Sequence, residues 1–183
     1  MSRTLDEQRQ EYSQRRFLAM PLAGTIAWII IGVSSFFLAD KQLVWVTFIA
    51  TGCIAYLGMF ISKFTGENFL DKNKPKNTFD SLFMHTVVQA LFVYAIAIPF
   101  FLIDYSSLPL TVGILTGLMW VPLSWVIKHK IGIIHTALRT VLIVGLWYLL
   151  PEQRFLAIPC AVILVYLITI YVLEKRWHRL HIL

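Results

Sequence analysis

Arg139 is the residue of this chain best placed to do chemistry, because it is the only charged residue inside any of the long apolar segments. A charge within the hydrocarbon of a bilayer is costly unless it is paired or faces water, so an arginine there indicates a functional site. The planar guanidinium group matches the geometry of a carboxylate or a phosphate. We therefore predict that Arg139 binds a small, anionic molecule.

Other polar residues are spaced so that they could join Arg139. His135 precedes Arg139 by four residues and shares its helix face, and His85 and Gln89 have the same spacing on another apolar segment. If the two helices are neighbours, these faces form one polar cavity open to the cytoplasm. Histidine near neutral pH can change its charge when such a cavity is occupied. The predicted ligand-binding residues are Arg139, His135, His85, Gln89, Thr86 and Thr136.

Two other interpretations of these residues stay open. In the first, Arg139 extends to the headgroups or bonds backbone carbonyls, and the histidines cap local polar groups. In the second, two histidines on facing helices hold a haem, which the lack of a second histidine pair disfavours. No cofactor or metal is predicted. The sequence also contains no arrangement of nucleophile and base, so we predict no catalytic residue and do not expect an enzyme.

The composition shows which elements must position these residues. Of 183 residues, 58% are hydrophobic and only 14% are charged, which is typical of an integral membrane protein. Each apolar segment is close to the ~20 residues that cross a bilayer as a helix. The segments are 17–38, 43–62, 81–103, 108–127, 131–150 and 155–173. Short connections pair them, so the predicted fold is all-α, with six transmembrane helices in three antiparallel hairpins.

The basic residues predict the orientation. Nearly all lysines and arginines lie in the N-terminal tail, the second and fourth loops and the C-terminal tail, and only Lys41 and Arg154 lie on the opposite side. Because basic residues near span ends stay in the cytoplasm, we predict that both termini are cytoplasmic, in a bacterial inner membrane. The net charge of +6 then indicates contact with anionic headgroups, and we do not expect nucleic-acid binding.

The chain divides into a short arm and one membrane domain. Residues 1–16 are predicted as a cytoplasmic amphipathic helix, because Thr4 and Glu7 form a capping box and Glu11 can pair with Arg15. This helix is expected to run into the first span. Residues 17–183 form the six-helix domain, and its last helix is expected to continue through 173–183 along the membrane surface.

Small residues mark the expected helix contacts. Gly113 and Gly117 form a G-x-x-x-G pair, and Ala19, Ala23 and Ala27 form a stripe on the first span. Such residues allow close helix approach in lipid, and we interpret them as internal contacts. The alternative is a face for a homo-oligomer or for another membrane subunit.

Several segments together carry a resemblance to a known family. They are the arm ending in Arg15 and Arg16, the first span with Ala23, Gly24 and Trp28, the polar second loop, and the fourth-span stretch Gly-Leu-Met-Trp-Val-Pro-Leu at 117–123. On these features the chain resembles, over most of its length, a family of uncharacterised bacterial six-helix membrane proteins, a domain of unknown function. The family motif resembles Gly-x-His-Tyr-x-Pro-Phe, and Met119 and Trp120 stand at its His and Tyr positions. The resemblance implies fold and location, and no activity.

These observations lead to two hypotheses for function. The first is binding or transport of a small, anionic molecule through a cytoplasm-facing polar cavity. The second is a non-catalytic interaction or scaffold subunit of a membrane complex. The expected partners are the lipid bilayer with its anionic headgroups, a small-molecule ligand, and a second copy of the chain.

Overall fold

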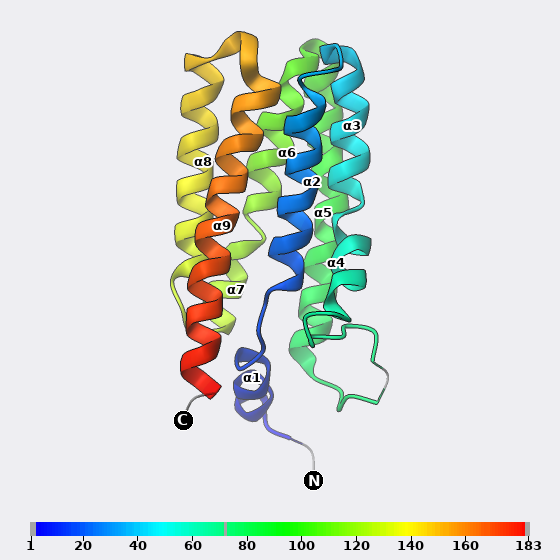
Figure 1. Ribbon diagram of the computed structural model, residues 1–183. Helices are drawn as coiled ribbons and strands as arrows, with labels where there is room; N and C mark the ends of the chain where they lie inside the picture. Colours follow the sequence, from blue (N-terminus) through cyan, green and yellow to red (C-terminus); the bar gives the residue numbers. More distant parts are fainter. Residues whose placement is uncertain (1–2, 72, 182–183) are drawn as a thin grey trace.

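The computed structural model describes residues 3–71 and 73–181, and within these ranges the chain is helical with no strand (Figure 1). The predicted ends of the arm and of the last helix, residues 1–2 and 182–183, lie outside the described residues. In chain order the helices are α1 (Leu5–Ser13), α2 (Ala19–Ser34), α3 (Asp40–Gly52), α4 (Ile54–Ser62), α5 (Thr78–Ile103), α6 (Leu108–Gly117), α7 (Trp120–Val126), α8 (Ile131–Leu149) and α9 (Arg154–His181), with 3₁₀ turns at Tyr105–Ser107 and Pro151–Gln153.

Several of these helices are long and apolar enough to cross a membrane. Four helical stretches in the described part of the chain meet this condition, at Thr78–Ile103, Tyr105–Val126, Ile131–Leu149 and Pro151–His181. The pair α3 and α4, bent by 40°, makes a fifth if it is taken as one span. Helix α2 is as apolar but has only 16 residues. The predicted all-α fold is therefore confirmed, and the length and composition of these helices suit a multi-pass membrane protein.

Two predicted spans are broken rather than continuous. The second span divides into α3 and α4 at Cys53, directly after Gly52. The fourth divides into α6 and α7 because Pro122 has no N–H to donate to the carbonyl of Leu118. That carbonyl accepts from the backbone N–H of Val121 at 3.1 Å instead, which leaves the carbonyl of Gly117 without its usual helical donor.

Helix α2 is at the centre of the packing. It packs against α3, α4 and α9, while α8 packs against α6, α7 and α9. Helix α5 packs against α6 and α1, and it is not a packing neighbour of α8. Both termini lie at one end of the bundle, which we call the terminal end (Figure 1).

The small residues predicted for packing lie in the interior. Ala19, Ala23 and Ala27 are at most 2% exposed, because their own chain covers them. A Cβ on Gly113 would lie 2.7 Å from the Cδ1 atom of Ile143 on α8, so a larger residue at the contact of α6 and α8 would have to displace this side chain. The alanine stripe is therefore not available as a docking face for another subunit.

The N-terminal arm differs from the prediction at its C-terminal end. The capping box is present, with the Thr4 hydroxyl accepting from the Glu7 backbone at 3.3 Å, but α1 ends at Ser13 and does not run into α2. Phe17 has a φ of 58°, in the left-handed region, which turns the chain between the two helices. This break lets Arg16 reach Glu174 on α9, where the two side chains form a bidentate ion pair at 2.6 and 2.9 Å.

Candidate functional site

Arg139 lies in the interior of the bundle without a counter-ion. Its side chain is 1% exposed, and no carboxylate of the described residues lies within ion-pairing distance. Its Nη1 atom donates to the Tyr166 hydroxyl at 3.2 Å, and its Nη2 atom donates to the Thr116 hydroxyl at 3.0 Å. The guanidinium of α8 thus joins α6 and α9 through neutral acceptors and keeps its full positive charge.

Aromatic rings complete the surroundings of this charge. The Arg139 Cζ atom lies 5.6 Å from the ring centroid of Trp28 and 5.3 Å from that of Tyr166. Both distances suit a cation–π interaction, which stabilises a desolvated cation by about 2 kcal/mol. These aromatic contacts stabilise the buried guanidinium of Arg139, but they do not neutralise its charge.

His135 lies beside Arg139 and is held as a neutral ring. Its Nδ1 atom is 2.8 Å from the Thr169 hydroxyl, which donates its own proton to the carbonyl of Val165 at 2.8 Å. Because that proton is already used, Nδ1 must carry a hydrogen and donate it to Thr169. The Nε2 lone pair then faces Arg139 Nη1 at 3.5 Å. His135 therefore acts as an acceptor that orients the guanidinium. The Trp120 ring stacks on the His135 ring, with 4.4 Å between the ring centroids.

Local backbone features of the neighbouring helices make room for the cluster. A Cβ on Gly117 would lie 3.1 Å from Arg139 Cδ, and a Cβ on Gly24 would lie 2.4 Å from Tyr166 Cζ. The Gly117 carbonyl, released by the break between α6 and α7, accepts from the Thr136 hydroxyl at 2.8 Å. The break is thus stabilised by the same helix that carries Arg139.

A cavity of about 410 Å³ lies next to this cluster, on the α5 side of the bundle. Helices α4 and α5 form its outer walls, and the hydroxyl-bearing residues Thr116 and Tyr166 belong to its inner wall. Most of its other lining side chains are apolar or aromatic. Exposed side chains on α4 and α5, among them Tyr56 and Leu91, also line it, so the cavity opens at the surface of the bundle between these two helices.

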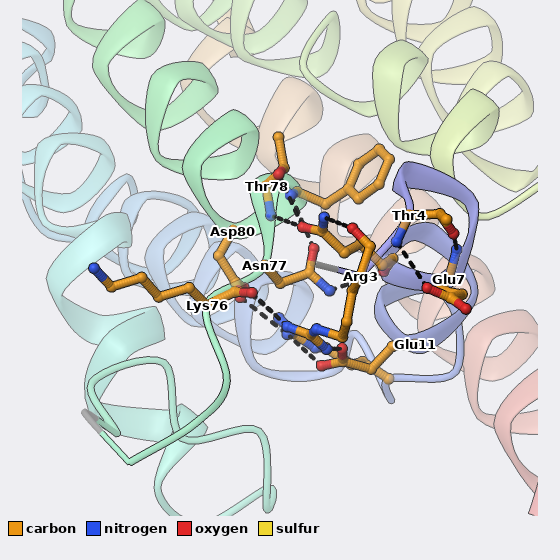
Figure 2. A network of polar contacts seen from close by, with 11 residues as sticks. Arg3, Thr4, Glu7, Glu11, Lys76, Asn77, Thr78 and Asp80 are labelled. Atoms are coloured by element: carbon orange, nitrogen blue, oxygen red, sulfur yellow. Dashed lines mark hydrogen bonds and ion pairs between the residues drawn. The ribbon is translucent and has the colours of Figure 1, made fainter. Parts of the chain in front are cut away.

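The N-terminal arm closes the terminal end of the cavity. Tyr12, Arg15 and Asp80 line it there, and the Arg15 guanidinium forms a two-point ion pair with the Asp80 carboxylate. Figure 2 shows Asn77 and Asp80 at the start of α5, next to α1. The Asn77 side chain donates to the backbone carbonyl of Gln8 on α1 at 2.8 Å. Arg15 and Asp80 thus satisfy each other, and the carboxylate of Glu67, which also lines the cavity, accepts from the backbone N–H groups of Leu18 and Ala19.

The Tyr166 hydroxyl is a polar group of the inner wall with a proton to offer. It accepts from Arg139, and none of the described residues accepts its proton. The Thr116 hydroxyl, in contrast, donates to the carbonyl of Val112 at 2.6 Å. Tyr166 can therefore donate to a molecule in the cavity, and the positive charge behind it strengthens that donation.

The structure brings together only part of the predicted site. Arg139, His135 and Thr136 belong to one cluster, as their spacing on α8 predicts. Thr86 lines the cavity, but from α5 and on the opposite wall. His85 and Gln89 are exposed on α5, and the His85 ring bonds the carbonyl of Ser81 at 2.7 Å. The expectation that they share a cavity with Arg139 was wrong, because α5 packs against α6 and not against α8.

Several residues of the cluster were not predicted from the sequence. Tyr166, Thr116 and Thr169 have no spacing that distinguishes them from the other hydroxyl-bearing residues of the spans. Trp28 lies in a segment that carries the family resemblance, and Trp120 stands at the Tyr position of the family motif, but neither was predicted to lie beside Arg139 or His135.

A family model describes nearly this whole chain. The model of a family of unknown function, DUF7010, matches residues 5–176. The chain belongs to the DUF7010 family. This result confirms the resemblance to an uncharacterised family over most of the chain. No curated protein and no solved structure matches it.

Proposed function

We propose that this chain crosses a bacterial inner membrane six times, with both termini in the cytoplasm. Helix α2 supplies the sixth span: its 16 helical residues are continued by the segment 35–38, and it packs against α9 and the bent pair α3 and α4, which are apolar enough to cross. An even number of spans agrees with the position of both termini at one end of the bundle (Figure 1). The excess of basic residues at that end supports the cytoplasmic orientation.

Within this architecture, the protein binds a small molecule in the cavity between α4 and α5. One observation carries the proposal: Tyr166 lines the cavity, and its hydroxyl has no acceptor among the described residues and is polarised by Arg139, a buried cation with no counter-ion. A negatively charged or strongly accepting group at Tyr166 would receive a charge-assisted hydrogen bond. The arginine at the other end of the cavity, Arg15, is less suited, because Asp80 already neutralises it.

The remaining walls indicate the rest of the ligand. They are mainly apolar, so the molecule needs an apolar body besides its acceptor group. The opening lies between two helices at the depth of the spans, so such a molecule reaches the cavity from the bilayer. We therefore propose an amphipathic, anionic ligand of modest size, and transport of this ligand is the activity to test once binding is established.

A binding experiment in lipid nanodiscs tests the proposal with probes that differ in one property. Decanoate supplies an apolar chain with a carboxylate, and methyl decanoate supplies the same chain without charge. We expect decanoate to bind more tightly. Tyr166→Phe keeps the ring and removes the donor, so it should weaken decanoate binding about tenfold or more, the size of a hydrogen bond to a charged group.

Tyr94→Phe is the matched control. Tyr94 also lines the cavity, and its hydroxyl is 2.8 Å from the Thr51 hydroxyl, but no cation stands behind it. This variant should change decanoate affinity by less than about threefold, because it removes a neutral hydrogen bond that need not involve the ligand. Equal losses in the two variants, or equal affinity for the two probes, would exclude the proposed role of Tyr166 and Arg139.

A further inference from the structure

Helix α5 has an exposed face that no other part of the described chain covers. Its exposed residues include one row at alternating intervals of four and three positions, which is the spacing of a left-handed helix–helix seam. These residues, which we call the α5 seam, are His85, Gln89, Phe92, Ile96, Pro99 and Ile103, and all of them are exposed. The seam is independent of the cavity, which the same helix borders with other residues, such as Thr86, Ala90 and Tyr94.

Gln89 makes this face unlike a surface that simply contacts lipid. It lies 11 residues from the start of α5, ~16 Å along the helix at 1.5 Å per residue. Its side chain forms no hydrogen bond with any residue in the described ranges. At this depth lipid chains cannot supply a donor or an acceptor, so an exposed carboxamide loses its hydrogen bonds entirely. Glutamine in such a position typically bonds to another helix.

We propose that a second copy of this chain packs on the α5 seam, with Gln89 of each copy bonded to Gln89 of the other. All copies have the same orientation in a membrane, so a two-fold axis between them runs along the membrane normal and brings each residue to the depth of its own counterpart. A carboxamide has both donors and an acceptor, and two of them can therefore pair reciprocally. Phe92 and Ile96 continue the same contact with apolar side chains.

Cysteine crosslinking in liposomes tests this arrangement directly. The background is the full chain with Cys53→Ala and Cys160→Ala, since both native cysteines are exposed. Mild oxidation should link copies that carry Phe92→Cys, which is in the seam. Copies that carry Leu91→Cys should not be linked, because this neighbouring exposed residue faces the rim of the cavity. Equal crosslinking at the two positions would indicate random collision and overturn the proposal.

Energy transfer between labelled copies in the same liposomes measures the contribution of Gln89. Gln89→Leu removes the carboxamide at similar volume and should weaken dimerisation about five- to thirtyfold, as expected for a lost interhelical hydrogen bond. Val88→Leu, at an exposed neighbour outside the seam, should leave it unchanged. A chain that stays monomeric at every ratio of protein to lipid would overturn the proposal. So would a photocrosslinker at position 92 that captures a different protein in native membranes.

Discussion

Gly24 on α2 lies directly against the phenol ring of Tyr166 on α9. A Cβ at position 24 would come within 2.4 Å of Tyr166 Cζ and 2.5 Å of its hydroxyl oxygen, closer than any real contact allows. The Tyr166 hydroxyl accepts a hydrogen bond from Arg139. Its position therefore depends on the absence of a side chain at Gly24, on another helix.

Gly24→Ala should displace Tyr166 and weaken both folding and binding. Moving the ring out of a packed core is expected to cost about 1–3 kcal/mol of unfolding free energy. The matched control is Gly145→Ala, because nothing lies within 4 Å of a Cβ at that position. The control should be neutral or slightly stabilising. Thermal unfolding and decanoate binding of the two variants in nanodiscs provide the comparison, and equal melting temperatures would show that Tyr166 can move without cost.

Arg139→Met should separate a structural role of the arginine from a binding role. Methionine has a similar length and is apolar, and replacement of a buried charge by a well-packed apolar residue is often neutral or stabilising by about 1–4 kcal/mol. We therefore expect an unchanged or higher melting temperature and a loss of preference for decanoate over methyl decanoate. A marked loss of stability together with intact preference would mean that Arg139 serves the fold alone.

Glu67→Ala should loosen the start of α2. The N-cap residue of this helix, Leu18, has no side chain that can cap it. The carboxylate of Glu67, in the loop before α5, caps the helix instead. It accepts from the backbone N–H groups of Leu18 at 2.8 Å and Ala19 at 2.7 Å. Loss of this cap should destabilise the protein by about 1–2 kcal/mol. Glu152→Ala, at an exposed acid in a 3₁₀ turn, is the control and should leave the melting temperature within a degree or two.

The turn between α7 and α8 should open as the pH falls. Burial, and to a smaller extent the Arg176 guanidinium, hold the pKa of His129 below its ordinary value of 6.5. Its Nδ1 atom accepts from the backbone N–H of Ile131 at 3.2 Å, which only the unprotonated nitrogen can do. The unfolded chain therefore binds this proton at a higher pH than the folded chain, and stability from His129 is present above pH 6.5 and decreases below it.

Hydrogen exchange at the start of α8 measures this opening. The amide of Ile131 should lose protection between pH 7.5 and 5.5, after correction for the intrinsic exchange rate. His129→Asn retains an acceptor at the position of Nδ1 but does not titrate, so it should remove the pH dependence. If the variant and the parent chain respond to pH in the same way, another group controls the turn.

Some features of the fold and site could be predicted residue by residue. The capping box of Thr4 and Glu7 was recognised because it depends on neighbours in sequence, and its hydrogen bonds are present. The shared face of His135 and Arg139 follows from the period of the helix. The end of α1 at Ser13 was not predicted, because it depends on Arg15 and Arg16 reaching Asp80 and Glu174, which are distant in the chain.

The sequence by itself determined that this chain is helical, that its apolar helices can cross a membrane, that it belongs to an uncharacterised family, and that Arg139 is its exceptional charge. Only the tertiary structure decided which helices meet, and so placed Tyr166 and Thr116 at Arg139 and left His85 and Gln89 outside. The reason is physical. A helix in lipid is apolar on every side, so hydrophobicity does not mark the face that packs, and the neighbours are selected by the fit of particular side chains against glycines and aromatic rings.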